Sequence, residues 1–113
     1  MAERWGNLAE QIREHCKEQD DVLLGFCVGA GSFCKGENYF GSTEDIANTL
    51  RGPEDIGRID KAYDDGFGGA DCPPVIVWTR DHVGVHDMYD GANGLRFVPR
   101  NPCDMEPEFI GGY

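Results

Sequence analysis

Hydrophobic residues near the start of the chain recur at intervals of three and four. Within residues 3–19 this spacing is kept by Trp5, Leu8, Ile12 and Cys16. Such spacing places the side chains on one face of a helix, with polar residues on the other. Asp20 and Asp21 follow directly, and their carboxylates oppose the negative end of a helix dipole. The pattern predicts an amphipathic helix over residues 3–19 whose apolar face packs on a sheet.

The rest of the chain contains short runs typical of strands. Residues 22–28 form a continuous apolar run, which favours a buried strand. Residues 75–80 are rich in β-branched and aromatic side chains, and residues 83–89 and 95–98 continue this composition. Asp90, Gly91, Asn93 and Gly94 lie between the last two runs, and such residues favour a hairpin turn. These runs predict four strands, the last three forming a β-meander.

Two short helices are expected in the middle of the chain. Ser42 is a good N-cap for a helix ending near Leu50. Pro53 suits the first turn of the next helix, whose apolar face would carry Ile56, Ile59 and Tyr63. The resulting order α-β-α-α-β-β-β predicts an α+β domain with a mostly antiparallel sheet and helices on one face.

The chain of 113 residues is short enough for a single domain spanning residues 1–113. We expect it to comprise an acidic helical segment at 42–66, the β-meander at 75–98 and an irregular tail at 99–113. Its apolar runs are far shorter than the roughly 20 residues of a membrane helix. The first residues lack the basic and apolar regions of a secretory signal. A cytoplasmic location is therefore expected.

Five cysteines occur, and neither a CxxC motif nor a regular spacing links them. An odd number of irregularly spaced cysteines is typical of thiols in a reducing compartment, so no structural disulfide is expected. Cys72 and Cys103 flank the pair His82 and His86, which offers four potential zinc ligands. However, histidines four apart in a strand lie about 13 Å from each other, too far to share an ion. No metal site is predicted there.

The glycine-rich stretch Gly29–Gly36 has the composition of a nucleotide-binding loop. A GxGxxG frame starting at Gly29 has Cys34 in place of the third glycine, and no Ser or Thr follows Lys35. Neither a dinucleotide nor a P-loop signature is present, so no cofactor is expected. Cys34 with a histidine from residues 82–86 is the best candidate for nucleophilic catalysis, but no catalytic signature surrounds it. We therefore expect a protein that is not an enzyme.

Charge carries more information than the motifs. The formal net charge is −11, which disfavours direct binding to nucleic acid or to anionic membranes and favours a basic partner. Residues 37–71 hold nine acids against three basic residues. Carboxylates spaced along helices resemble backbone phosphates, because Arg and Lys side chains bind both groups. The predicted partner-binding residues are Glu44, Asp45, Glu54, Asp55, Asp60, Asp64 and Asp65.

The acidic stretch Ser42–Asp71 and the β-meander that ends in Tyr89-Asp90-Gly91 and Val98-Pro99-Arg100-Asn101-Pro102 support a comparison at the level of class. A small, strongly acidic α+β domain resembles the inhibitors of host defence encoded by phages and mobile elements, such as anti-CRISPR and anti-restriction proteins. The resemblance implies a complex with a CRISPR effector or nuclease that blocks DNA binding or nuclease recruitment. Two alternatives stay open: a small-molecule or nucleotide-binding domain that uses Gly29–Gly36, and an interaction module whose acidity only aids solubility.

Overall fold

The computed structural model describes residues 5–29, 47–60, 62–64, 74–89 and 92–107. Residues 5–6, 62–64, 88–89 and 92–93 are described through their backbone alone. The elements, in chain order, are β1 (Trp5–Asn7), α1 (Leu8–Gln19), β2 (Leu23–Val28), the 3₁₀ helix η1 (Pro53–Ile59), β3 (Ala62–Asp64), β4 (Val75–Thr79), β5 (His82–Tyr89) and β6 (Ala92–Pro99).

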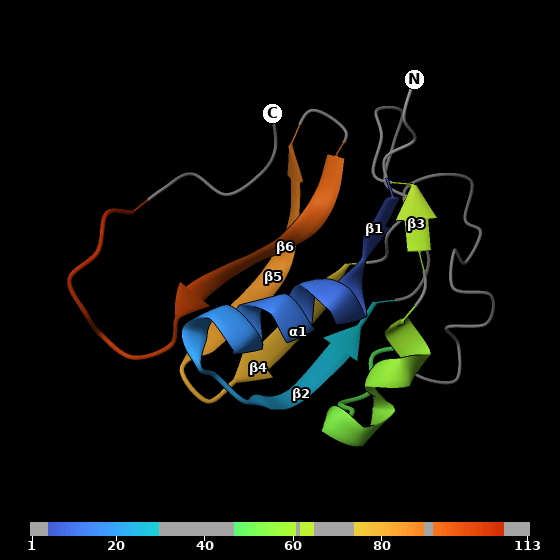
Figure 1. Ribbon diagram of the computed structural model, residues 1–113, viewed down its shortest axis with the longest axis horizontal. Coiled ribbons are helices and arrows are strands. Elements are labelled where there is room, and N and C mark those ends of the chain that lie inside the picture. The colour runs from blue at the N-terminus through green and yellow to red at the C-terminus, as the bar shows by residue number, and fades with distance from the viewer. Residues whose placement is uncertain (1–4, 30–46, 61, 65–73, 90–91, 108–113) are drawn as a thin grey trace.

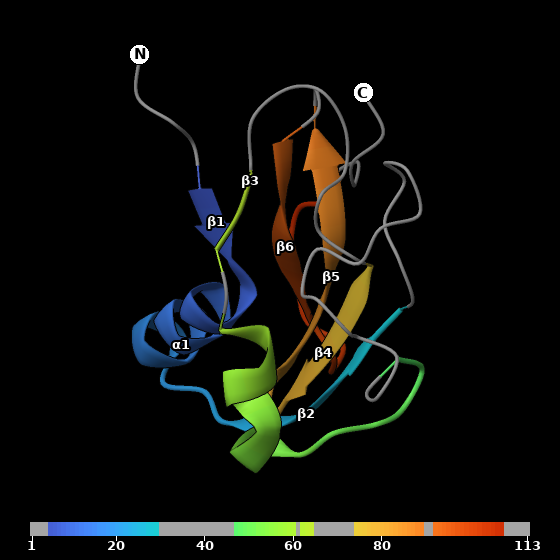
Figure 2. The ribbon, with the colours of Figure 1, turned by 90° about the vertical axis from the view of Figure 1, so that its right-hand side faces the viewer.

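The predicted α+β class is confirmed, with one N-terminal α-helix and a four-stranded antiparallel sheet. The strand order is β2-β4-β5-β6, so the last three strands form the expected meander. β4 and β5 are joined by the two residues Arg80 and Asp81, and β5 pairs with β6 from His82–Pro99 to Tyr89–Ala92. α1 lies across one face of this sheet, and η1 lies beside it (Figures 1 and 2).

The core lies between α1 and the sheet. Leu8 and Ile12 on α1 are buried against the inward side chains of the strands, as the helical spacing predicted. The buried apolar residues are Leu8, Ala9, Ile12, Phe26, Val28, Ile59, Val75 and Val77. Cys16 is half-buried and packs at the edge of this core. The helix therefore docks through the stripe that the sequence shows.

The helix begins later than predicted. Trp5–Asn7 forms β1, which pairs antiparallel with β3, so the expectation of a helix from residue 3 is wrong. Asn7 has extended backbone angles, and its side-chain oxygen accepts a hydrogen bond from the Glu10 amide at 3.1 Å. This N-cap starts the helix at Leu8. At the other end Asp20 adopts a left-handed conformation (φ 51°) and stops the helix where predicted.

The central segment differs from its prediction. Residues 47–50 are not helical, so the helix expected to end at Leu50 does not reach that residue. Asn48 has a positive φ of 60°, and its amide donates to the Val28 carbonyl at 2.7 Å. Arg51 and Phe26 exchange backbone hydrogen bonds of 2.8 and 2.9 Å. Pairing with β2 satisfies the backbone groups that a helix would have used.

The second central helix is present, but it is shorter and of the 3₁₀ type. It ends at Ile59, and Tyr63 lies in β3, so Tyr63 does not belong to the helix face expected for it. Ile59 alone is fully buried, whereas Ile56 packs against the core from its margin. The tail has no regular structure from Arg100 to Pro107, as predicted. Among the described residues, no helix is long and apolar enough to cross a membrane.

Candidate functional site

The face of the sheet that points away from α1 carries apolar side chains that the described elements leave open. β4 shows the alternation directly, since Val75, Val77 and Thr79 are buried on the α1 side. Ile76 and Trp78 point to the opposite face. Ile76 is 42% exposed, and Leu24 of β2 is 50% exposed. An exposed apolar surface rimmed by polar residues is typical of a binding site.

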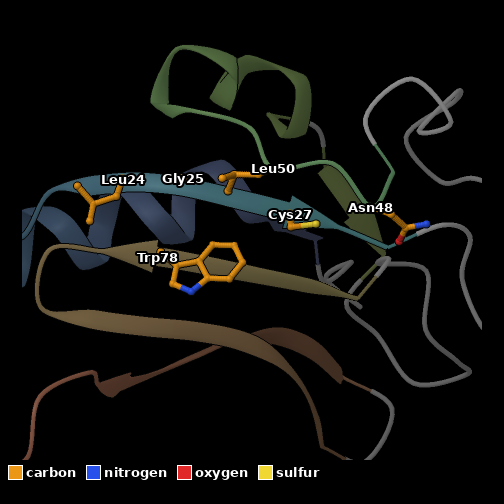
Figure 3. Close-up of a pocket in the computed structure, with 6 residues that line it drawn as sticks. All are labelled: Leu24, Gly25, Cys27, Asn48, Leu50 and Trp78. Atoms are coloured by element: carbon orange, nitrogen blue, oxygen red, sulfur yellow. The ribbon is translucent and has the colours of Figure 1, made fainter.

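A pocket of about 410 Å³ lies on this open face. Figure 3 shows it between β2 and the segment that precedes η1, with Trp78 projecting from β4 on its lower side. The lining residues are Leu24, Gly25, Cys27, Asn48, Leu50 and Trp78. Most of this lining is apolar, and the Asn48 amide supplies a polar group. An apolar pocket with few polar groups suits one hydrophobic or aromatic side chain of a partner.

Gly25 explains how the upper wall of the pocket forms. A β-carbon on residue 25 would lie 2.8 Å from the Arg51 carbonyl oxygen and 3.2 Å from a Leu50 methyl carbon. The missing side chain therefore lets residues 50 and 51 approach the strand and form the hydrogen bonds to Phe26. The Leu50 side chain is 69% exposed. The wall depends on a glycine in the strand and on a non-helical segment beside it.

The described members of the predicted acidic contact set lie on or next to η1. Glu54 is exposed, whereas Asp55 lies 3.6 Å from Arg58 and 3.9 Å from Arg51. Asp60 accepts hydrogen bonds from Arg13 at 2.9 Å and from Asn7 at 3.0 Å. Of the remaining members, Asp64 is described through its backbone in β3, and Glu44, Asp45 and Asp65 lie outside the described residues.

These internal ion pairs reduce the negative charge that Asp55 and Asp60 present to a partner. Hydrogen bonds from Arg13 and Asn7 lower the pKa of Asp60, so that carboxylate stays charged but already has a cationic partner. Asp55 has cationic neighbours on two sides. Figure 3 shows η1 directly beside the pocket. Glu54 follows the pocket-lining residue Leu50 by four positions, and its carboxylate oxygens lie 2.6 Å from where a β-carbon on residue 52 would be. The sequence did not predict that the acidic helix continues directly from a pocket wall.

A second group of polar residues lies on the other side of the sheet, around Asp21. This carboxylate follows the helix and has a fully buried side chain. Its Oδ1 accepts from the backbone amides of Val22 and Asp81 at 2.9 and 3.1 Å. Its Oδ2 accepts from the Thr79 hydroxyl at 2.5 Å. The Nε2 of His15 and the Nδ1 of His82 each lie 2.9 Å from the same Oδ2.

The surroundings of Asp21 fix its charge state. Burial raises the pKa of this carboxyl, but hydrogen bonds from Thr79, His15, His82 and the Val22 amide outweigh that effect and place the pKa well below its usual range. The side chain is therefore a carboxylate. The two imidazole rings meet edge to face with centroids 4.7 Å apart. His15 also stacks on Phe97, at 3.8 Å between centroids and 8° between planes.

Sequence reasoning paired His82 with His86 and did not connect it to His15 or Asp21. Both His82 and His86 do lie in the strand expected for them. His15 stands three residues after Ile12, which places it beside the apolar stripe of α1. A polar side chain beside an apolar stripe was the feature of the sequence that could have indicated a buried polar group here. Asp21 had none, because its partners Thr79 and His82 lie about 60 residues further along the chain.

Comparison of the chain with protein-family models, curated proteins and solved structures gives no match in any of the three.

Proposed function

We propose that this protein is a non-enzymatic inhibitor that binds a basic, nucleic-acid-handling protein through the open face of its sheet. The observation that supports the proposal is the apolar pocket, whose wall at Leu50 is followed along the chain by the acidic first turn of η1. Binding energy at protein interfaces concentrates in a few central apolar and aromatic contacts, while surrounding charges guide the approach. Trp78 and Leu50 form such a centre, and the acidic first turn of η1, with Glu54, follows Leu50 along the chain.

The net charge of the chain indicates the class of partner. The net charge of −11 attracts basic surfaces at long range and repels acidic ones. A basic protein that handles nucleic acid binds phosphates through Arg and Lys side chains, and carboxylates compete for the same side chains. An acidic protein seated on that surface would exclude DNA or RNA. The expected effector is therefore one that loses nucleic-acid binding, as with a CRISPR effector or a restriction nuclease.

The test uses a panel of purified RNA-guided CRISPR effectors and restriction nucleases, each bound to a labelled target duplex. Adding this protein is expected to release the duplex from at least one of them at a stoichiometric ratio. Leu50→Asp should abolish release, because it puts a charge into the pocket wall. Met105→Asp is the matched control, since Met105 is likewise an exposed apolar residue, at 53%, but lies in the tail, outside the pocket lining.

Three results would contradict the proposal. The first is an unchanged duplex complex across the panel, and the second is release that Leu50→Asp and Met105→Asp weaken equally. The third is native mass spectrometry that finds a small apolar molecule bound to the purified protein and lost in Leu50→Asp. That result would support the alternative of a small-molecule-binding domain.

The contribution of the acidic helix η1 is tested separately through the rate of association. Glu54→Lys should slow association with the responsive effector and reduce its dependence on salt, because exposed charges outside the apolar centre act mainly on encounter. Asp55→Lys makes a poorer probe, since Arg51 and Arg58 would then face a third cation. An association rate that Glu54→Lys leaves unchanged between 50 and 500 mM salt, which spans about a threefold change in screening length, would limit the interface to the apolar pocket.

A further inference from the structure

Three side chains of types that bind metals lie close together, although they come from separate parts of the chain. They are His15, Asp21 and His82. His15 is in the last turns of α1, Asp21 follows the helix, and His82 begins β5. Their donor atoms all lie within 4.8 Å of one another. The carboxylate is fully buried, and the side chains of His15 and His82 are only 10% and 22% exposed.

The distances from Asp21 to both histidines match the separation between two ligands of one transition-metal ion. Zinc binds histidine nitrogen at about 2.0–2.1 Å and carboxylate oxygen at about 2.0–2.2 Å. Two such ligands lie about 2.9 Å apart at a right angle and about 3.4 Å apart at the tetrahedral angle. Oδ2 of Asp21 is 2.9 Å from each imidazole nitrogen. The two nitrogens lie within 4.8 Å of each other and would be about 3.4 Å apart in a tetrahedral site, so an ion requires movements of up to roughly 0.7 Å at each histidine ring.

The surrounding contacts hold the three donors in place. Oδ1 of Asp21 is fixed by two backbone amides, and Thr79 also donates to Oδ2, so the carboxylate cannot rotate freely. The Phe97 ring fixes the plane of His15 by stacking on it. Such outer contacts orient ligands in metal sites and raise affinity, because less freedom is lost on binding.

The chemistry of the donors selects the class of ion. Two imidazoles and one carboxylate suit zinc and neighbouring divalent transition metals, whereas calcium and magnesium prefer oxygen donors alone. We propose that His15, Asp21 and His82 form a Zn²⁺ site, with Nε2 of His15, Nδ1 of His82 and Oδ2 of Asp21 as its ligands. The partial exposure of His82 leaves access for water as a fourth ligand. The ion links the end of α1 to the β4–β5 hairpin, on the face of the sheet opposite the proposed interface.

Without an ion, the same residues form a hydrogen-bonded network. Binding measurements distinguish this network from a metal site. Tag-free protein treated with a chelator is titrated with Zn²⁺ by calorimetry and with Co²⁺ by visible absorption. One ion per chain is expected, with the Co²⁺ bands of a nitrogen and oxygen site and without the charge-transfer absorption of a cysteine ligand. Zn²⁺ should also raise the melting temperature above that in EDTA.

Variants assign the ligands. Since loss of an outer partner costs metal sites about 10- to 100-fold in affinity, loss of a ligand in His82→Gln or His15→Gln should cost at least about 100-fold. His86→Gln is the matched control, because His86 lies in the same strand but outside the cluster. Imidazole ¹⁵N chemical shifts provide a second readout that needs no variant: His15 and His82 should shift on adding Zn²⁺, and His86 should not.

Two outcomes would overturn the site. One is the absence of saturable Zn²⁺ binding in the folded wild-type protein. The other is binding that shifts no imidazole resonance, or that His86→Gln weakens as much as His82→Gln. Asp21→Asn removes the central ligand but also a buried hydrogen-bond acceptor, so its fold is checked by circular dichroism first. His82→Gln and the ¹⁵N shifts keep the test valid if that variant does not fold.

Discussion

Gly84 and Phe97 face each other across the β5–β6 pair, and the Phe97 ring fills the space that a β-carbon on residue 84 would need. Such a β-carbon would lie 2.7 Å from the Phe97 Cε1 atom. His15 stacks on Phe97, so the ring has little room to move away. Gly84→Ala should therefore lower the free energy of unfolding by about 1–3 kcal/mol, as other overpacked cores do. This loss of stability can be measured by urea denaturation, with an m-value that is expected to stay unchanged.

Gly57→Ala is the control for that substitution. No atom lies within 4 Å of a β-carbon built at residue 57, so alanine should be neutral or stabilise the protein by up to about 1 kcal/mol. Equal destabilisation by both variants would show that the loss comes from glycine replacement in general and would contradict the role of Phe97.

Docking of α1 on the sheet can be measured through Leu8. This side chain is fully buried between the helix and the strands. Leu8→Ala should cost about 2–5 kcal/mol of stability, in line with other large-to-small changes in a core. Leu50→Ala, at a leucine that is 69% exposed, should change stability by about 0.5 kcal/mol or less. A melting temperature that Leu8→Ala leaves unchanged would mean that the helix does not dock.

The Arg13–Asp60 ion pair predicts a pH-dependent term in stability. Hydrogen bonds from Arg13 and Asn7 lower the pKa of Asp60 below its ordinary value of 3.8. A carboxyl whose pKa is lower in the folded state adds stability above the unfolded pKa and loses it as the pH falls through the folded pKa. The difference in urea midpoint between wild type and Asp60→Asn should therefore be present at pH 7 and disappear in strong acid. A difference that is constant with pH would contradict the assignment.

Thiol reactivity should differ between Cys16 and Cys103. Burial, with the nearby charge of Asp21 as a second cause, raises the pKa of the Cys16 thiol, although a hydrogen bond with the Leu23 backbone partly offsets this. Cys103 is exposed in the tail. Because the thiolate is the reacting form, iodoacetamide at pH 8 should modify Cys103 well before Cys16. Mass mapping of the digested protein gives both rates, and equal rates in the folded state would contradict the prediction.

The strands could be predicted from sequence because their signals are local. β-branched runs, and the Asp-Gly pair in the sequence between the last two of them, predict the meander, and the helical stripe of Leu8 and Ile12 predicts the packed face of α1. β1 was missed because its partner, β3, lies about 60 residues away. Residues 47–50 were assigned to a helix because local preference favours one there, whereas hydrogen bonds to β2 decide the outcome.

The candidate sites depend on contacts that a linear pattern does not contain. The pocket arises where Gly25 lets Leu50 approach, and nothing in the spacing of these two residues indicates it. The Asp21 group forms only when the β4–β5 hairpin brings Thr79 and His82 to the end of α1. Charge was readable from composition, but its pairing was not, since Asp60 is matched by Arg13 from a distant helix.

The hydrogen bonds that join residues 47–51 to β2 also prevent a strand of another chain from pairing with this edge of the sheet. An open edge strand offers free amides and carbonyls to any other chain, and this is a common route to aggregation. On β2, Phe26 already exchanges two such bonds with Arg51, and the Val28 carbonyl accepts one from the Asn48 amide. At the opposite edge the Leu95 amide of β6 donates to the Gln11 side chain at 2.9 Å. A chain with an exposed apolar sheet face is thereby directed toward association through that face rather than through its edges.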